Sequence, residues 1–135
     1  MKKIKFHAAG ALIIMPDNKV ALFKRTGGEG FDLPFGKKEK GETPEQTARR
    51  ECLEEVGIEI EIIDHIPHFE RMMKKDKRYI TFLAKPIKQY EASHKDEGEL
   101  LIGPAYLLAT GKYSEYNVAM LAHFASHGIN LWITQ

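Results

Sequence analysis

One helix of this chain is marked at both of its ends, between residues 43 and 57. Thr43 is a favourable N-cap, Pro44 suits the first helical position, and Gln46 completes a capping box of the T-x-x-Q form. Gly57 readily adopts the left-handed backbone conformation that ends many helices. The sequence therefore predicts a helix between Thr43 and Gly57, with each boundary set by local signals.

Three carboxylates are concentrated on this helix. Glu51, Glu54 and Glu55 fall within an arc of roughly 100° of the helix surface. Like charges three and four residues apart repel by about 0.2–0.5 kcal/mol per pair, so stability alone does not favour this arrangement. A divalent cation would offset the repulsion, and oxygen atoms are the ligands that Mg²⁺ and Mn²⁺ prefer. The patch therefore indicates a metal site.

An ordinary solvated acidic face is the alternative interpretation, with Arg49 and Arg50 partly neutralising the charge. The opposite side of the helix is expected to pack against the rest of the protein, through Ala48, Cys52, Leu53 and Val56. Cys52 is thus expected to be a buried thiol rather than a nucleophile.

The first two thirds of the chain contain most of the expected strands. Apolar or alternating runs bounded by turn residues predict strands at residues 6–15, 20–23, 58–63, 68–72 and 78–87. The sequence PDNK at 16–19 predicts a hairpin turn, and MKKDKR at 73–78 predicts a hairpin loop. Between them lie a glycine-rich loop at 26–30 and a short extended piece at 31–36, because Pro34 disfavours helix for the residue before it.

The last third of the chain is expected to be loop and helix. Residues 89–99 are polar and loop-like, and residues 104–111 are compatible with a short helix. A second helix is predicted from Ser114 to His127 and ended by Gly128. Its expected core-facing stripe consists of Val118, Leu121, Ala122 and Ala125.

Composition limits the classes of partner. The chain has 135 residues, 43% hydrophobic and 29% charged, which predicts one globular domain over residues 1–135. The formal net charge of +1 gives no global field that favours nucleic acid or an anionic membrane, so neither is expected as a partner. The single cysteine and the lack of a long apolar run predict a reduced, cytoplasmic protein. Oligomeric state is left open.

The spacing of the acidic residues matches a known signature. From Gly36 to Ile58 the sequence is G-x5-E-x7-R-E-C-L-E-E-V-G-I, which fits the Nudix box G-x5-E-x7-R-E-U-x-E-E-x-G-U, where U is a bulky apolar residue. Cys52 occupies one U position as a small hydrophobe. Leu33 and Pro34 also resemble the LPGG sequence of many members, with Phe35 at the first of those glycines. On these residues the chain is identified as a member of the Nudix hydrolases.

The resemblance implies a fold and a reaction. Nudix proteins are α+β proteins in which a mixed central sheet lies between helices, as an α/β/α sandwich. They are enzymes that hydrolyse a nucleoside diphosphate linked to a further moiety X, and water attacks phosphorus in the presence of Mg²⁺. The resemblance therefore implies Mg²⁺, or Mn²⁺ in its place, as the cofactor, and a small-molecule nucleotide as the substrate.

Residue roles follow from the same resemblance. Glu54 and Glu55 are implied as the principal metal ligands, with the Gly36 carbonyl as a further one. Glu51 is implied as a ligand or as the general base for the attacking water, and these two roles stay open. Arg50 is implied to orient Glu51 through charge-assisted hydrogen bonds. The implied catalytic set is thus Glu51, Arg50 and Glu54.

Residues outside the helix complete the expected site. Glu42, inside the box, is implied as a peripheral ligand or as a partner that supports the ligands. Many Nudix enzymes supply one more carboxylate from a later loop, and Glu97 and Glu99 are both candidates here. His94 is a weaker candidate in the same loop. The sequence does not choose between Glu97 and Glu99.

Substrate contacts are expected from basic and aromatic side chains near the box. Arg25, Lys37 and Lys38 are candidates for binding phosphate. One aromatic side chain is expected to stack on the base, with Tyr79 as the candidate, from a group that also includes Phe6, Phe23, Phe69 and Phe82.

The identity of X is the least determined feature. RYITFLAK at 78–85 resembles a strand of the diadenosine tetraphosphate hydrolases, as does LPFG followed by KKEKGE. Nucleoside polyphosphates, including dinucleoside polyphosphates, are therefore the first expectation. Hydrolysis of damaged (d)NTPs to the monophosphate and pyrophosphate is the second. A Nudix-fold sensor that binds a nucleotide without cleaving it is the alternative from another functional class.

Overall fold

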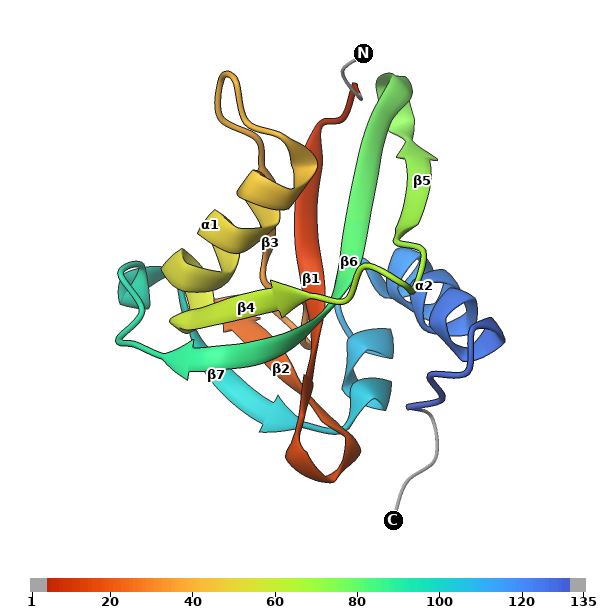
Figure 1. The fold of residues 1–135 in the computed structure, drawn as a ribbon. Coiled ribbons are helices and arrows are strands. Elements are labelled where there is room, and N and C mark those ends of the chain that lie inside the picture. Colours follow the sequence, from red (N-terminus) through yellow and green to blue (C-terminus); the bar gives the residue numbers. More distant parts are fainter. Residues whose placement is uncertain (1–4, 132–135) are drawn as a thin grey trace.

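A twisted mixed sheet with one helix on each face forms the body of the protein (Figure 1). The computed structural model of the protein describes residues 5–131. Helix α1 (Pro44–Val56) covers one face of the sheet and helix α2 (Ser114–Ser126) covers the other. The strands are β1 (Ala8–Met15), β2 (Lys19–Arg25), β3 (Phe35–Lys37), β4 (Ile58–Ile62), β5 (Phe69–Met73), β6 (Lys77–Gln89) and β7 (Gly98–Gly103). The short 3-10 helices are η1 (Pro16–Asn18), η2 (Lys74–Asp76), η3 (Lys95–Glu97) and η4 (Ala105–Ala109). This confirms the expected α+β sandwich.

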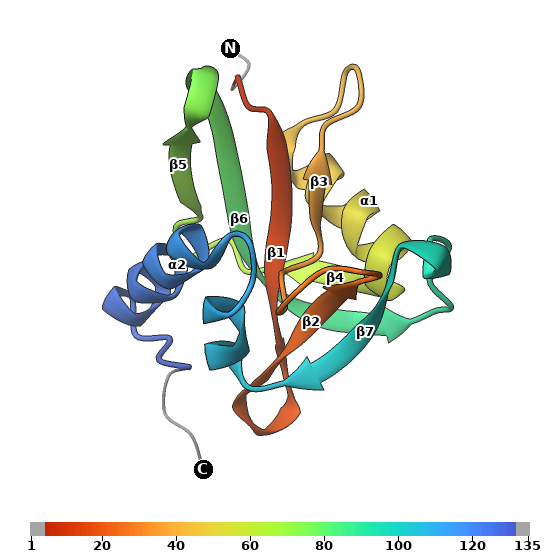
Figure 2. The ribbon, with the colours of Figure 1, turned by 180° about the vertical axis from the view of Figure 1, so that it is seen from behind.

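Strand β1 is the centre of the topology. It runs parallel to β6, with Ala8 opposite Tyr79 and Ile13 opposite Ala84. Its first residues also pair antiparallel with β3, and its last two residues pair with β2. Strand β7 extends the sheet beyond β2, while β4 and β5 both pair with β6. The short β3 is therefore held against the start of β1, under α1 (Figure 2).

Alternation along the strands divides the apolar residues into two cores. On β1, Ala9, Ala11 and Ile13 contribute to the core under α1, whereas Leu12 contributes to the core under α2. The first core also contains Phe23, Ala48, Cys52, Val56, Ile58, Ile60 and Ile80. The second also contains Leu22, Leu33, Leu83, Leu108, Tyr116, Met120 and Phe124. The two faces of the sheet thus have separate packing environments.

Helix α1 confirms the prediction made from its ends. The Thr43 hydroxyl accepts a hydrogen bond from the Gln46 amide at 3.2 Å, and the Thr43 amide donates to the Gln46 side chain at 2.9 Å. Gly57 has a φ of 70° and closes the helix through its amide. Cys52 is completely buried, as expected.

The expected faces of both helices need correction. Leu53 is 39% exposed, whereas Glu51 and Glu55 are only 8% and 4% exposed, so α1 turns two of its carboxylates inward. The cause is β3 and the residues before it, which cover this side of the helix and bring the Phe35 amide to Glu55. The buried face of α2 also differs from the expected stripe. Its buried residues are Tyr116, Asn117, Met120, Leu121 and Phe124. Val118 is 41% exposed.

The strands expected from the sequence are confirmed as β1, β2, β4, β5 and β6. Strand β7 was not expected, because it lies at the end of a polar segment and is defined by its pairing with β2. Residues 104–111 contain the 3-10 helix η4, in agreement with the short helix expected there. No helix within residues 5–131 combines the length and apolarity needed to cross a membrane.

Candidate active site

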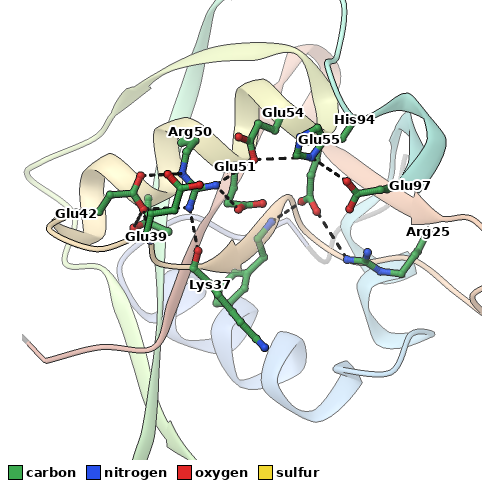
Figure 3. A network of polar contacts seen from close by, with 12 residues as sticks. Arg25, Lys37, Glu39, Glu42, Arg50, Glu51, Glu54, Glu55, His94 and Glu97 are labelled. Atoms are coloured by element: carbon green, nitrogen blue, oxygen red, sulfur yellow. Dashed lines mark hydrogen bonds and ion pairs between the residues drawn. The ribbon is translucent and has the colours of Figure 1, made fainter.

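Arg50 is the centre of a network of carboxylates on α1 and on the loop before it (Figure 3). Its guanidinium donates two hydrogen bonds to Glu42, at 2.7 and 3.0 Å. It also donates to Glu51 at 2.8 Å and to Glu54 at 3.0 Å. A further bond, at 2.9 Å, reaches the carbonyl of Lys37 on β3. With Glu39 at 3.6 Å, one cation therefore lies within ion-pair distance of four carboxylates, and it joins the helix to β3.

Glu42 lies at the outer end of this network. Besides Arg50, it accepts hydrogen bonds from the Thr47 hydroxyl at 2.8 Å and from the Glu39 amide at 2.7 Å. The bond to Arg50 is the main reason why the pKa of Glu42 falls to about 2, although partial burial opposes the shift. Glu42 is therefore held by Arg50, Thr47 and the Glu39 amide.

Glu55 and Glu51 form the buried end of the network. Glu55 accepts a hydrogen bond from the Phe35 amide at 2.9 Å, and Arg25 lies 3.7 Å from its other oxygen. Burial raises the pKa of Glu55 to about 8, with the Phe35 amide opposing the shift and the charge of Glu51 adding to it. Burial also raises the pKa of Glu51, and Arg50 opposes that change. Such desolvated carboxylates are typical of functional sites.

A later loop contributes Glu97 on the same side of the molecule. The His94 amide donates to the backbone carbonyl of Glu54 at 2.9 Å, which fixes this loop to α1. The His94 ring lies 2.9 Å from a Glu97 oxygen and 3.8 Å from a Glu54 oxygen (Figure 3). The His94 ring therefore lies within ion-pair distance of both Glu97 and the α1 residue Glu54.

Glu99 projects from the other face of the sheet. It lies opposite Lys24 in the β2–β7 ladder, one residue from the pair Phe23–Leu100, which packs toward α1. Because side chains alternate along a strand, Glu99 points away from α1. The structure thus brings Glu97, and not Glu99, toward the carboxylates of the helix.

The side chains offer oxygen donors that fit a hard divalent cation. As they lie, no three histidine, cysteine, aspartate or glutamate side chains of residues 5–131 form a group that could hold a metal ion. Glu51 and Glu54 are both paired with Arg50. Gly36 leaves space beside them: a Cβ at this position would lie 2.3 Å from the carboxyl carbon of Glu51. A bound cation and Arg50 would therefore compete for Glu51 and Glu54.

An aromatic pocket of about 240 Å³ lies on the other face of the sheet, beside α2. Phe35 and Tyr79 form part of its wall, with ring centroids 5.3 Å apart, and Tyr79 lies 5.8 Å from Tyr116. Asp32 and Asn117, whose side chains are 3.4 Å apart, contribute polar atoms to it. Burial raises the pKa of Asp32, and its contact with Asn117 opposes the shift. Flat walls with few polar groups suit a nucleobase.

Three of the residues predicted to contact substrate, Arg25, Lys37 and Tyr79, line this pocket. Lys38 does not line it; its ammonium lies over the Phe6 ring, 5.4 Å from the centroid. Phe6, Phe23 and Phe82 are core residues, and Phe69 packs on the Tyr116 ring.

The sequence-based prediction missed four pocket residues, namely Asp32, Tyr113, Tyr116 and Asn117. Asn117 is buried on the apolar side of α2, where its amide donates to the Leu108 carbonyl at 3.1 Å. A polar residue inside an apolar helical stripe is the signal that could have found it, but the predicted stripe runs through other positions.

Comparisons with known proteins agree with this architecture. A family model described as a NUDIX domain matches residues 5–105. Over 75 residues the chain is 36% identical to an 8-oxo-dGTP diphosphatase of Proteus vulgaris, a match that covers 50% of this chain and 67% of that protein. Over 81 residues it is 35% identical to an RNA pyrophosphohydrolase of Vibrio atlanticus. This match covers 58% of this chain but only 46% of that protein.

A solved structure shows the same fold. The structure of an Ap4A hydrolase from C. elegans superposes with a TM-score of 0.67 over 89% of this chain and 96% of that one, at 20% sequence identity. Since the NUDIX-domain model also matches most of the sequence and the box residues surround Arg50 and Gly36, the chain belongs to the Nudix hydrolase family.

Proposed function

We propose that this protein cleaves a phosphoanhydride bond in a nucleoside polyphosphate or dinucleoside polyphosphate, with Mg²⁺ or Mn²⁺ as cofactor. One observation carries the proposal: Arg25 and Gly36 line the aromatic pocket and also contact the α1 carboxylates. A base in the pocket would therefore have its phosphates beside the acidic helix. Arg25 is suited to bind them, because its guanidinium donates several hydrogen bonds to a phosphate.

The chain's own residues have distinct roles in this proposal. Glu54, Glu55 and the Gly36 carbonyl would hold the cation, with Glu97 completing the set of oxygen donors and Glu51 left free to act as the base. A bound divalent cation neutralises charge on the phosphates and makes water more acidic. Arg50 positions Glu51 through the 2.8 Å hydrogen bond, and a carboxylate oxygen of Glu51 accepts the proton of the attacking water. The water oxygen bonds to phosphorus while the bridging P–O bond breaks and its electrons leave with the departing phosphate.

A substrate panel tests the proposal. The purified chain is incubated with dinucleoside polyphosphates and nucleoside triphosphates in Mg²⁺ or Mn²⁺, and phosphate is measured after treatment with pyrophosphatase or phosphatase. Glu54→Gln is expected to lower turnover by about 100-fold or more, because a metal-binding charge is lost. The exposed Glu45 on the same helix provides the matched control, Glu45→Gln, which should keep full activity.

Two results would contradict the proposal. One is unchanged turnover in Glu54→Gln. The other is tight nucleotide binding with no phosphate released from any substrate, which would identify a nucleotide sensor instead of an enzyme.

Hydrolysis of damaged (d)NTPs is a second candidate function. The pocket volume of about 240 Å³ suits a single base, and the relative from Proteus vulgaris is named an 8-oxo-dGTP diphosphatase. The products separate the two candidates: this reaction gives a nucleoside monophosphate and pyrophosphate. A larger kcat/KM for 8-oxo-dGTP than for both dGTP and dinucleoside polyphosphates would favour it.

A further inference from the structure

His94 lies on the segment between β6 and β7 and is hydrogen-bonded to the backbone of α1. Its amide donates to the Glu54 carbonyl at 2.9 Å, and the Tyr90 amide, four residues earlier, donates to the Gly57 carbonyl at 2.6 Å. These two bonds attach the segment to the end of α1, where the helix carries Glu54 and Glu55. The backbone that carries the His94 ring is therefore fixed beside the carboxylates of the helix.

The position of the proton on the His94 ring follows from its partner. Nδ1 lies 2.9 Å from a carboxylate oxygen of Glu97. Because a carboxylate oxygen only accepts, Nδ1 donates this hydrogen bond and carries the proton of the neutral ring. The Glu97 amide also donates to the His94 carbonyl, at 3.1 Å. His94 thus holds Glu97 through its backbone and through its side chain.

Glu97 depends on this contact for its orientation. Its side chain is 50% exposed, and within residues 5–131 the His94 ring is the single hydrogen-bond or ion-pair partner of its carboxylate. Burial is the main reason why the pKa of Glu55 rises, and the charges of Glu51 and Glu97 add to the shift. The carboxylates of α1 therefore repel Glu97, and without a hydrogen bond this side chain would turn toward solvent.

The ring also lies close to a carboxylate of the helix. Its Nδ1 is 3.8 Å from the Glu54 oxygen that accepts a hydrogen bond from Arg50 at 3.0 Å. The ring is thus placed between Glu54 on α1 and Glu97 on η3 (Figure 3). A donor in this place keeps oxygen atoms from two elements near each other, as a cation with ligands from both elements requires.

We propose that His94 is a positioning residue for the cation site: it donates from Nδ1 to Glu97 and keeps that carboxylate beside Glu54. The inference rests on the proposed function, in which Glu54 and Glu97 share one cation. In this role His94 contacts neither the cation nor the substrate, and it adds no chemical step. Loss of a hydrogen bond that orients a ligand typically lowers metal affinity by about 10–100-fold.

Mn²⁺ titrations of the full chain without nucleotide test this role, with free Mn²⁺ followed by its EPR signal. His94→Ala is expected to bind Mn²⁺ about tenfold more weakly. His94→Asn should restore most of the affinity, because the amide nitrogen of asparagine takes a position close to that of Nδ1. His94→Gln should not restore it, since the glutamine amide reaches the position of Nε2. Rescue by asparagine alone would separate a hydrogen bond at Nδ1 from a general need for a side chain.

A double-mutant cycle shows whether His94 acts through Glu97. Glu97→Ala and the double variant His94→Ala/Glu97→Ala should bind Mn²⁺ with the same affinity, because the effect of His94 disappears once its partner is gone. His68 provides the matched control, since its Nε2 lies 2.9 Å from Glu70 in a similar pair on β5, a strand that packs against α2. His68→Ala should therefore bind Mn²⁺ as the wild type does.

The metal dependence of turnover gives a second measurement. His94→Ala should need about tenfold more Mn²⁺ than the wild type to reach half of its maximal rate, because the cation is held less tightly. At saturating Mn²⁺ its kcat should stay close to that of the wild type, since the reacting groups are intact.

The possible failures are distinguishable. If the wild type binds Mn²⁺ and releases phosphate while His94→Ala binds Mn²⁺ equally well, the inference is overturned and the proposed function stands. A double variant that binds Mn²⁺ more weakly than Glu97→Ala would also overturn it, since His94 would then act without Glu97. A Glu97-dependent loss of Mn²⁺ affinity in His94→Ala, with no phosphate released by the wild type from any substrate, would support the inference and overturn the proposed function.

Discussion

Gly36 is the residue at which the two sides of the site approach most closely. Its position lines the aromatic pocket, and a Cβ there would lie 2.3–2.5 Å from the carboxyl group of Glu51. Its φ lies outside the left-handed region, so the need for glycine arises from this contact and not from the backbone. A side chain at this position would move Glu51 before it disturbed the fold.

Gly36→Ala is therefore expected to lower kcat by about 100-fold with little change in stability, because Glu51 would be displaced from its hydrogen bond to Arg50. Turnover and the thermal midpoint are measured together. Gly103→Ala is the control, since the atoms nearest to a Cβ there, at 3.3 Å and beyond, belong to Leu22, Leu107 and Leu101, none of which lies on α1. Full activity in Gly36→Ala would show that this contact does not position Glu51.

Glu42 gives a prediction about pH. Its pKa falls from 4.5 to about 2 on folding, so the folded protein binds this proton less tightly than the unfolded chain. The stabilisation it provides is complete above about pH 4.5 and is lost as the pH falls toward 2. Glu42→Gln should lower the free energy of unfolding at pH 7 by about 2 kcal/mol, the size of a hydrogen bond to a charged group.

Urea titrations of Glu42→Gln in EDTA check this expectation between pH 7 and pH 2.5. The difference between variant and wild type should shrink as the pH decreases. A difference that stays constant across this range would contradict the assigned role of Glu42, and the exposed Glu45→Gln serves as the control.

At the scale of elements, the end of α1 is held by the segment that leads to η3. The Tyr90 amide donates to the Gly57 carbonyl at 2.6 Å, and the Gln89 side chain donates to the Val56 carbonyl at 2.9 Å. A Cβ on Gly57 would lie 2.2 Å from the Tyr90 carbonyl oxygen. The same glycine thus ends the helix and permits the approach of the loop that carries Glu97.

Gly57→Ala should consequently destabilise the protein and impair activity. Gly128 ends α2 with a φ of 91°, but a Cβ on this residue would have no neighbouring atom within 4 Å, so Gly128→Ala carries the conformational cost alone. That cost is about 1–2 kcal/mol for a residue held in the left-handed region. Thermal unfolding should show a larger loss for Gly57→Ala, and only this variant should lose turnover. Equal effects of the two substitutions would mean that the Tyr90 contact is unimportant.

The elements also show which features can be predicted from sequence. The ends of α1 depend on residues only a few positions apart, and their prediction is confirmed. Strand β7 depends on a partner that is about 80 positions away in the sequence, and its apolar run, at residues 100–102, is short. The burial of Glu51 and Glu55 depends on β3, and the burial of Asn117 depends on the Leu108 carbonyl and Asp32. The box identified the acidic residues, whereas tertiary contacts decided which of them are buried.

At the scale of the whole molecule, Arg25 connects the two faces of the sheet. It lies two residues after Phe23 on β2, reaches Glu55 at 3.7 Å and lines the aromatic pocket. Its side chain is 55% exposed, and an ion pair of this length and exposure contributes little to stability. Arg25 is therefore available for substrate.

Arg25→Ala should lower kcat/KM for a nucleoside triphosphate by about 10–100-fold, because a charge-assisted contact to phosphate is lost, with a thermal midpoint close to that of the wild type. Lys24→Ala removes the neighbouring cation, which does not line the pocket and lies over the Phe31 ring. Steady-state kinetics of both variants are compared. A similar loss in Lys24→Ala would indicate a general charge effect.

The sheet that separates the acidic helix from the aromatic pocket has a consequence for inhibitor design. A compound that competes for the α1 carboxylates would meet groups specified by the Nudix box, which other members of the family have in common. A compound confined to the opposite side would meet Asp32, Tyr113 and Asn117, none of which belongs to the box. Selectivity among these enzymes should therefore be sought in the pocket beside α2, at residues that the box does not specify.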